Sequence, residues 1–317
     1  MTNRLLLYII LFPVILQAQR IDNTVSYRGM NSDSYFRFNY DNDFFSALDL
    51  YYTQGYSFEL AGVWLEKNPV NKIFITAGNN SNVYGLLFEQ SGFTPTDITA
   101  DEILYGDRPF AATIALKSFL SSTDTINKSR FTSSLTLGMI GPAAFGDEMQ
   151  TGIHKWIDDD IPMGWQYQIK NDVIINYELG YEKQLFNLSN IFALTSQLKV
   201  RLGTLNTNLS TGFTATLGIL NNPFSAQANR PFQVYLFAHP AGTLVGYDTT
   251  MQGGLFNTKS PYTIPDSDIE RVTLQNSYGI VIKYRSLYLE YFQSAVTREF
   301  ATGSSHRWGG FKAGFTF

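Results

Sequence analysis

The residues best able to do chemistry in this sequence are one histidine and the polar side chains spaced around it. His154 follows Gln150 by four residues, so the two would share one face of a helix, and the acidic run Asp158-Asp159-Asp160 comes soon after. Carboxylates, amides and hydroxyls form an oxygen ligand set that suits a hard cation, Ca²⁺ above all. A histidine beside such an ion could hydrolyse an ester without a protein nucleophile. The imidazole would take a proton from water, and the metal would stabilise the oxyanion that forms.

Less specific interpretations of these residues stay open. A single helical histidine is more often an ordinary surface residue than a catalyst, and an acidic run is usually a solvated loop. Acidic side chains could also bind divalent cations that bridge lipopolysaccharide phosphates, without any catalysis. Other common hydrolase solutions are absent, because the chain has no cysteine, no HExxH motif and no GxSxG motif.

The elements that must position these residues are strands, because a period of two runs along nearly the whole chain. In 193–203, Leu198 and Val200 take one face while Lys199 and Arg201 take the other. Segments of about ten residues with this alternation, separated by turns, are typical of transmembrane strands. A soluble β-sandwich would alternate as well. Here, however, one face is aromatic and aliphatic over many strands while the other carries full charges, so we expect an all-β protein, a transmembrane antiparallel β-barrel.

Composition agrees with a membrane barrel. The chain of 317 residues contains 25 Phe, 19 Tyr and 4 Trp, and only 16% of it is charged, against about 25% in an ordinary soluble domain. Mean hydropathy is −0.10, and beyond residue 20 no apolar run approaches the roughly 20 residues of a membrane helix. A hydrophobic content of 44% excludes disorder, and the slight acidic excess argues against nucleic acid as a partner.

The terminal Phe317 closes an alternating strand, as in the assembly signal of outer-membrane barrels.

The N-terminus indicates export. We interpret residues 1–18 as a cleaved signal peptide, with a positive charge at Arg4, an apolar core over 5–16 and cleavage after Ala18. A membrane helix that stays attached is the alternative, but the apolar core is short and no charged flank follows it. The mature chain, 19–317, shows no linker or internal repeat, so we expect one domain.

Parity favours twelve strands, because single-chain barrels usually have an even strand number with both ends in the periplasm. Treating 232–250 as one strand, despite the His239-Pro240 interruption, gives that number. The candidate strands are 34–43, 53–62, 82–89, 109–118, 129–140, 169–183, 192–203, 211–220, 232–250, 274–284, 287–299 and 307–317.

Counting strands from the periplasm predicts which way the side chains of the first strand point. Phe36, Phe38 and Tyr40 would face lipid, so Asp41 and Asp43 would face the lumen.

The same parity turns Thr53, Ser57 and Glu59 of the second strand inward. It puts Asn42 on the outward face, so Asn42 can join Asp43 only if the first strand bulges or ends there.

The polar residues converge on the extracellular rim. Segment 141–168, which carries His154 and is expected to contain a short helix near 143–157, joins two strands at that rim. The segment Gly106-Asp107-Arg108 opens a strand there, and Arg298-Glu299 closes another. The periplasmic connections, such as 285–286, are expected to be short and to carry few chemically capable residues. A purely structural barrel would not need such a difference between its two ends.

Several sequence blocks, in this order and over essentially all of the mature chain, resemble the outer-membrane lipid A 3′-O-deacylase family. The most specific block runs from Gly141-Pro142 through Gln150 to His154. The others are Asp41-Asn42-Asp43-Phe44, Tyr52-Thr53-Gln54-Gly55, Gly106-Asp107-Arg108-Pro109-Phe110-Ala111, Gly164-Trp165-Gln166-Tyr167, Asp248 with Gln252-Gly253, and Arg298-Glu299-Phe300. Some members have a lysine just before the Gly-Asp-Arg motif, where this chain has Tyr105.

The resemblance implies a twelve-stranded barrel in the bacterial outer membrane whose active site faces the cell exterior. It also implies a Ca²⁺-dependent esterase that removes the 3′-linked acyloxyacyl group of lipid A, acting on lipopolysaccharide among outer-membrane lipids, and we expect a monomer. His154 would be the base that activates water. The remaining implied site residues are Asn42, Asp43 and Thr53 around the metal and oxyanion, Asp43 and Asp160 as metal ligands, and Gln150, Arg108 and Asp107 in support.

Two other classes stay open. One is a phospholipase-like esterase on the same barrel. The other is a non-catalytic barrel, either a channel or a lipopolysaccharide-binding scaffold. Phe237, Tyr288 and Phe292 point inward in the expected register and would fill the lumen, which weighs against a channel.

Overall fold

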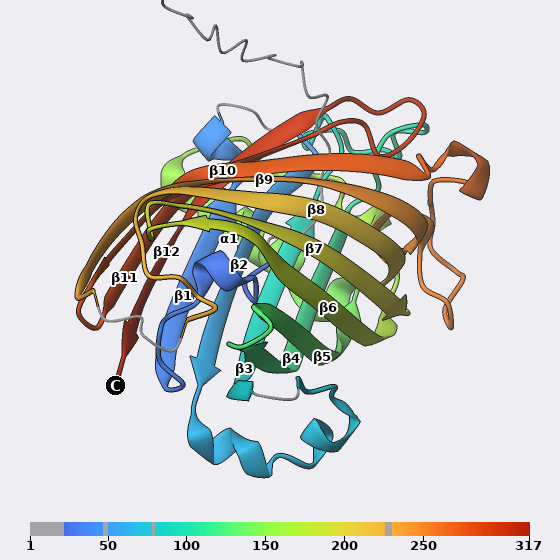
Figure 1. The fold of residues 1–317 in the computed structure, drawn as a ribbon. Helices are drawn as coiled ribbons and strands as arrows, with labels where there is room; N and C mark the ends of the chain where they lie inside the picture. Colours follow the sequence, from blue (N-terminus) through green and yellow to red (C-terminus); the bar gives the residue numbers. More distant parts are fainter. Residues whose placement is uncertain (1–21, 47–49, 78–79, 226–229) are drawn as a thin grey trace, which may run out of the picture.

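Twelve antiparallel strands close into one barrel in the computed structural model, which describes residues 22–46, 50–77, 80–225 and 230–317 (Figure 1). Each strand pairs with its neighbours in the sequence, and the first pairs with the last, so that no edge is left open. The strands are β1 (Tyr35–Asn42), β2 (Tyr52–Ala61), β3 (Asn80–Phe93), β4 (Ala111–Asp124), β5 (Ser129–Ile140), β6 (Asp172–Leu188), β7 (Phe192–Gly203), β8 (Asn206–Ile219), β9 (Phe232–Asp248), β10 (Val272–Tyr284), β11 (Leu287–Val296) and β12 (His306–Thr316).

The predicted fold and strand number are therefore confirmed, and β9 is a single strand. Its register with β8 passes over His239 and Pro240, as expected where proline supplies no N–H donor. Of the helices within the described residues, none is both long and apolar enough to span a membrane. The predicted signal peptide, 1–18, lies outside the described residues.

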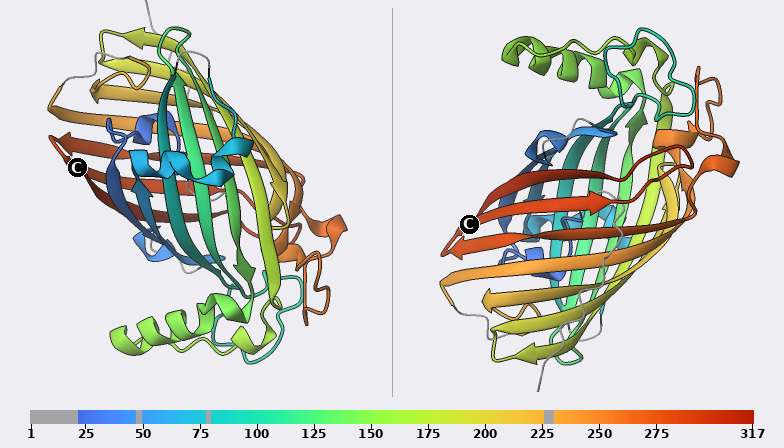
Figure 2. Two further views of the ribbon diagram at one scale, coloured as in Figure 1. Left: turned by 90° about the horizontal axis from the view of Figure 1, so that it is seen from below. Right: turned by 90° about the horizontal axis from the view of Figure 1, so that it is seen from above.

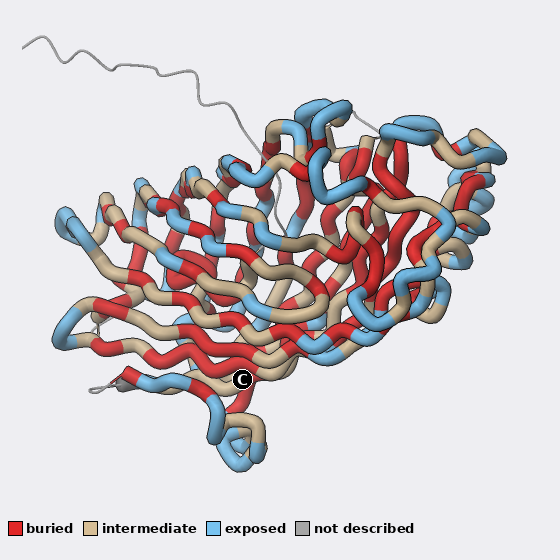
Figure 3. Tube along the Cα trace, turned by 90° about the vertical axis from the view of Figure 1, so that its right-hand side faces the viewer, coloured by how far each residue is buried: buried red, intermediate tan, exposed pale blue. Residues whose placement is uncertain are grey.

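Strand alternation separates an apolar outer face from a polar inner one. Along β1 every second residue, beginning with Tyr35, is buried, while Phe36, Phe38 and Tyr40 are only partly so. The outward rings pack against one another from strand to strand, as Phe36 does on Phe58. Figure 3 shows the same alternation as red and paler segments along the strands. Because neighbouring strands present apolar side chains side by side, the outer face forms the belt that a bilayer requires.

The lumen is filled rather than open. The predicted inward rings of Phe237, Tyr288 and Phe292 are buried. Residues 22–30, which include the short helix η1 (Ser26–Arg28), also lie inside the barrel and bond to its inner wall.

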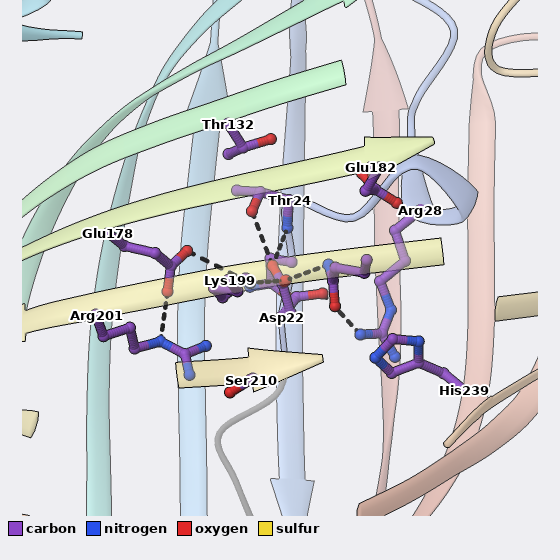
Figure 4. A network of polar contacts seen from close by, with 12 residues as sticks. Asp22, Thr24, Arg28, Thr132, Glu178, Glu182, Lys199, Arg201, Ser210 and His239 are labelled. Atoms are coloured by element: carbon purple, nitrogen blue, oxygen red, sulfur yellow. Dashed lines mark hydrogen bonds and ion pairs between the residues drawn. The ribbon is translucent and has the colours of Figure 1, made fainter. Parts of the chain in front are cut away.

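Ion pairs hold this N-terminal segment, and Figure 4 shows part of the network. Arg28 pairs with Glu290 of β11 at 2.6 Å, and Asp22 pairs with Lys199 of β7. Ser26 Oγ donates to Glu182 of β6 at 2.7 Å. The barrel therefore carries its own plug, made of chain that precedes β1.

The two ends of the barrel differ. We call the end with Ser34 and Phe317, whose backbones bond at 3.2 Å, the terminal rim, and the opposite end the loop rim. Contrary to the prediction, the connections at the terminal rim are not all short. The one between β2 and β3 carries two 3-10 helices, η3 (Val63–Lys67) and η4 (Pro69–Ile73). Their half-buried and exposed apolar side chains have no strand periodicity, which is why an alternation pattern overlooked them.

The loop rim carries the helices that concern the candidate site. The expected short helix is α1 (Gly146–Ile157), preceded by η5 (Pro142–Ala144) and followed by η6 (Trp165–Tyr167). A second helix, α2 (Thr249–Gln252), follows β9. In both views of Figure 2, α1 lies beside the barrel, outside its wall, rather than across its mouth.

Candidate active site

Polar residues on the outer face of the barrel are buried beneath the α1 segment. Gln54 of β2 and Gln90 of β3 point outward, where lipid-facing side chains would be expected, yet they are 3% and 1% exposed. Gln90 Nε2 donates to the carbonyl of Ala144 at 3.2 Å. Segment 141–168 therefore covers a patch of the outer wall near the loop rim, and we call this patch with its cover the outer-wall site.

A β-bulge turns Thr53 into this patch. The β2–β3 register shifts between Tyr52 and Gln54, which leaves Thr53 as the extra residue. A β-carbon on Gly92 would lie 3.0 Å from Thr53 Cγ2 and 3.8 Å from Gln54 Cγ, so both side chains lie on the outer side with Gly92. The prediction that Thr53 faces the lumen is therefore wrong, because a bulge breaks the count of two.

Tyr52 takes the inward position instead. Its hydroxyl donates to Asp41, and its ring packs on Trp308 with centroids 5.6 Å apart. A side chain at Gly55 would occupy the space of the Tyr52 ring. The Tyr52-Thr53-Gln54-Gly55 block thus encodes one inward ring, a glycine that makes room for it, and a threonine that faces out.

Asn42 and Asp43 lie where β1 ends. The strand stops at Asn42, and the 3-10 helix η2 (Asp43–Ser46) begins directly after it. The Asn42 side chain accepts a hydrogen bond from Phe44 N at 2.7 Å, and Asp43 accepts one from Leu50 N at 2.8 Å. Because Asp43 lies beyond the strand, parity no longer fixes its direction, so the expected lumen-facing Asp43 does not follow from alternation. Asn42 pairs in register with Gln54 and therefore lies on the outer side.

A chain of neutral hydrogen bonds connects α1 to the wall. Trp165 Nε1 donates to Gln150 Oε1 at 2.7 Å, and Gln150 Nε2 donates to Thr53 Oγ1 at 3.1 Å. The indole can only donate, so it fixes which end of the Gln150 amide faces Thr53. Gln150 is 1% exposed, which means that water does not compete for these bonds.

His154 lies one helical turn beyond Gln150. The helix ends at Ile157, and its C-cap Asp158, with a φ of 60°, reverses the chain. The reversal brings the backbone carbonyl of Asp160 to 2.5 Å from His154 Nδ1. A carbonyl can only accept, so Nδ1 carries the hydrogen and the lone pair of the neutral ring lies on Nε2. The Asp159 carboxylate is 3.9 Å from Nδ1. Asp160 thus contacts His154 through its carbonyl oxygen, and its carboxylate is exposed.

The other predicted support residues lie elsewhere. Asp107 accepts hydrogen bonds from Thr96 N at 2.8 Å and Arg108 N at 2.7 Å, which fixes the β3–β4 connection. Arg108 lies on the lumen side, paired with Glu299. Burial raises the pKa of the Glu299 carboxyl, and the Arg108 guanidinium opposes that rise in part.

Sequence reasoning missed two parts of this arrangement. Trp165 belonged to a recognised block, but nothing in its spacing indicated a bond to Gln150. The bulge at Thr53 had one indirect signal in the sequence, the glycine at position 55. The Tyr52 ring, which the bulge turns inward, needs the space that a side chain at Gly55 would fill.

The oxygen donors near the outer-wall site suit a hard cation only in part. Within the described ranges, no group of three or more His, Asp or Glu side chains is close enough to hold a metal ion. The candidate donors for an ion near Asn42 and Thr53 are therefore the Asp43 carboxylate together with neutral amide, hydroxyl, carbonyl and water oxygens. Ca²⁺ accepts such mixed oxygen sets.

A closed antiparallel barrel with an apolar outer belt, a plugged lumen and a covered polar patch on its outer wall defines an outer-membrane type of β-barrel that is not an open pore. The chain belongs to the family described as outer membrane protein LpxR, whose model matches residues 5–317. It is similar in fold to LpxR from Salmonella typhimurium, with a TM-score of 0.74 and 21% identity over 90% of this chain and 100% of that one. The β domain of the Bordetella autotransporter BrkA is a more distant match, with a TM-score of 0.48 and 10% identity over 90% of this chain and 99% of that one. No curated protein matches the sequence.

Proposed function

We propose that this protein is an outer-membrane esterase that hydrolyses the 3′-O-linked acyloxyacyl group of lipid A, with its loop rim facing the cell exterior. Family membership and the sequence blocks described above support the substrate class. The single observation that carries the proposal is the hydrogen-bond chain from Trp165 through Gln150 to Thr53. It joins the helix that bears His154 to an outward hydroxyl on the lipid-facing side of the wall, where a lipid ester could arrive.

His154 is the general base in this proposal. With Nδ1 held by the Asp160 carbonyl, Nε2 is free to take a proton from water as the water oxygen attacks the ester carbonyl carbon. The tetrahedral intermediate then collapses, the bond to the sugar oxygen breaks, and the proton on Nε2 passes to that leaving oxygen. The products are a free acyloxyacyl acid and a 3′-hydroxyl, with one water consumed.

Thr53 is the donor to the developing oxyanion. Its oxygen already accepts a hydrogen bond from Gln150, so its own hydroxyl hydrogen is available for the negative oxygen. A donor held in place before the reaction stabilises the transition state without having to reorganise. The bond from Trp165 to Gln150 removes the remaining rotational freedom of that donor chain.

Ca²⁺ is the proposed cofactor, with Asp43, Asn42, Thr53 and Asp160 as the candidate sources of ligands. When bound, it would supply positive charge near the carbonyl oxygen that becomes negative. The exposed Asp160 carboxylate would have to turn toward the site to take part, because the observed Asp160 contact to His154 uses the backbone carbonyl.

Access from the outer leaflet is consistent with the surface around the site. Phe44 of η2 is 80% exposed, and Trp156 at the end of α1 is 85% exposed. The Phe44 ring packs on Phe45, and Phe45 packs on Phe311 of β12, so this side of the site adjoins the apolar belt, and a lipid could reach the outer-wall site by lateral diffusion without entering the lumen.

Mass spectrometry of lipid A from cells that express the protein tests the proposal, with and without chelation of Ca²⁺. We expect loss of the 3′ acyloxyacyl mass, and we expect chelation to prevent it. Unchanged lipid A together with fatty acid released from glycerophospholipid would instead identify a phospholipase-like esterase.

A further inference from the structure

Three sequence blocks that the proposed chemistry does not use converge on Arg108. Its Nη1 donates to Glu299 of the β11–β12 connection at 2.5 Å, and its Nη2 donates to Thr250 of α2 at 2.7 Å. Asp248 in turn accepts from Thr250 N at 2.8 Å. Loops that follow β3, β9 and β11 are thus tied together by one guanidinium.

This guanidinium lies on the side of the wall opposite to the outer-wall site. Arg108 is 2% exposed, and it lines a cavity of about 70 Å³ inside the barrel mouth. A cavity of that size has room for a few water molecules. Because this cavity lies on the lumen side, the barrel wall would separate Arg108 from a lipid bound at the outer-wall site, and the position of Arg108 does not suit a substrate contact there.

A stack of rings leads from Arg108 to the bulge. Its Cζ lies 4.5 Å from the centroid of the Phe93 ring, and the Phe93 and Tyr52 centroids are 5.4 Å apart. Phe93 and Tyr52 are the last paired residues before the register shift, and Thr53 comes next. The inward position of Tyr52 and the outward position of Thr53 are two sides of one backbone irregularity.

We propose that Arg108 is a positioning residue that acts through Thr53. The buried Arg108–Glu299 pair holds Phe93 and Tyr52 on the lumen side, which keeps the bulge in place and so aims the Thr53 hydroxyl outward. This inference rests on the proposed function for its effect on catalysis, although its geometric part can be tested separately. A lysine could not replace the arginine, because it has no flat face to stack on Phe93 and no fixed fork for two acceptors.

A disulfide cross-link tests the geometric part without any activity. The natural chain has no cysteine, and a β-carbon on Gly92 would lie 3.0 Å from Thr53 Cγ2, which suits a disulfide between Thr53→Cys and Gly92→Cys. With mild oxidation by copper phenanthroline, we expect cross-linking of most of the folded barrel. Adding Arg108→Lys should lower the cross-linked fraction at least two-fold, because Thr53 is no longer held outward.

The matched control is Arg298→Lys. Arg298 lies in the same connection as Glu299, but its ion pair with Glu270 is at the surface, with the Arg298 side chain 56% exposed. This control should leave the cross-link unchanged. Heat-dependent gel mobility of each variant reports whether the barrel is folded, and cross-linked fractions are compared among folded molecules only.

Kinetics on purified lipid A tests the catalytic part. We expect Arg108→Lys to lower kcat about ten-fold with KM within two-fold, equally for lipid A with and without its 4′-phosphate. In a Thr53→Val background the same substitution should add less than a two-fold loss, because its effect passes through Thr53.

The outcomes separate the two hypotheses. An undiminished cross-link in folded Arg108→Lys would overturn the inference, as would a kcat loss that persists in full without the Thr53 hydroxyl. A loss confined to phosphorylated lipid A would overturn it too, because it would make Arg108 a substrate contact. A wild-type protein that releases no acyl group from lipid A would defeat the proposed function alone, and the cross-link would still decide the inference.

Discussion

The outer-wall site and the plugged lumen are both polar and both buried, but their polar atoms are satisfied in different ways. In the lumen, charges meet charges, as Arg28 meets Glu290 and Lys199 meets Asp22. At the outer-wall site a neutral chain, Trp165 to Gln150 to Thr53, ends on a hydroxyl whose hydrogen is still available. Paired charges hold the N-terminal segment inside the barrel. A chain of neutral hydrogen bonds that ends on a free hydroxyl donor can instead form a further hydrogen bond to a bound substrate.

This contrast explains why the lumen, although it holds several buried ion pairs, is a poor place to look for the reaction. Buried ion pairs such as Arg37–Glu59, at 2.7 Å, already use the charges that would recognise a substrate. At the outer-wall site, none of the described residues bonds to His154 Nε2 or accepts the hydroxyl hydrogen of Thr53. Variants of His154 and Thr53 are therefore matched with lumen variants as controls.

The largest effect is expected from His154→Ala. Removal of a general base lowers rates by about 10²–10⁴-fold, so we expect kcat for lipid A deacylation to fall about a thousand-fold. The matched lumen variant is His239→Gln, since His239 is buried against Thr214 at 2.8 Å, and it should retain kcat within three-fold. Equal losses in the two variants would abolish the distinction between the two regions.

The next effect concerns stability and belongs to the lumen. Glu290→Gln leaves the buried Arg28 without its counter-ion, and such a loss destabilises a fold by about 3–5 kcal/mol. A urea titration monitored by tryptophan fluorescence should show this loss in the free energy of unfolding. The value of kcat at 25 °C should stay within two-fold of wild type. Glu270→Gln, which removes the half-buried partner of the exposed Arg298, should lower stability by less than about 1 kcal/mol. A Glu290→Gln protein that is stable but inactive would reverse the roles assigned to the two regions.

A somewhat smaller effect is expected from Thr53→Val, which keeps the shape and removes the hydroxyl. Loss of one preorganised donor lowers kcat by about 10²–10³-fold, and KM should change little because the donor acts in the transition state. Thr214→Val removes a lumen hydroxyl of similar burial and should leave the kinetics unchanged. An increase in KM alone for Thr53→Val would mean that Thr53 binds substrate rather than stabilising an oxyanion.

The smallest effect is expected from Trp165→Phe. The Gln150 amide loses the donor that fixes it, and one net hydrogen bond contributes about 0.5–1.5 kcal/mol, so kcat should fall about five-fold. The double variant with Thr53→Val should be no slower than Thr53→Val alone, since Trp165 acts only through that hydroxyl. Additive losses would place Trp165 outside the proposed chain.

Much of the fold could be predicted from the sequence, because alternation reports on each strand locally. The twelve segments matched the twelve strands, and β5 and β7 matched residue for residue. Among the ends that differed most are the end of β4, at Asp124 instead of 118, and the start of β8, at Asn206 instead of 211, and both lie in stretches rich in small polar residues that alternate weakly. Helix α1 was predictable from its spacing for the same local reason.

What the sequence did not reveal depends on contacts between distant segments. Residues 22–30 have no periodicity of their own, and only the wall charges of β6, β7 and β11 determine that they enter the lumen. Thr53 was predicted to face inward because a count of two cannot detect a bulge. The resemblance implies Arg108 as a support residue of the site, but a sequence motif does not tell on which side of the barrel wall a side chain lies.

The most direct test of the outer-wall account is tandem mass spectrometry of lipid A incubated with the purified protein in vesicles with Ca²⁺. We expect wild-type protein to remove the acyloxyacyl group from the 3′ oxygen and from no other position, His239→Gln to do the same, and His154→Ala to leave lipid A intact. Acyl loss from another position, or deacylation that survives His154→Ala, would contradict the role proposed for the outer-wall site.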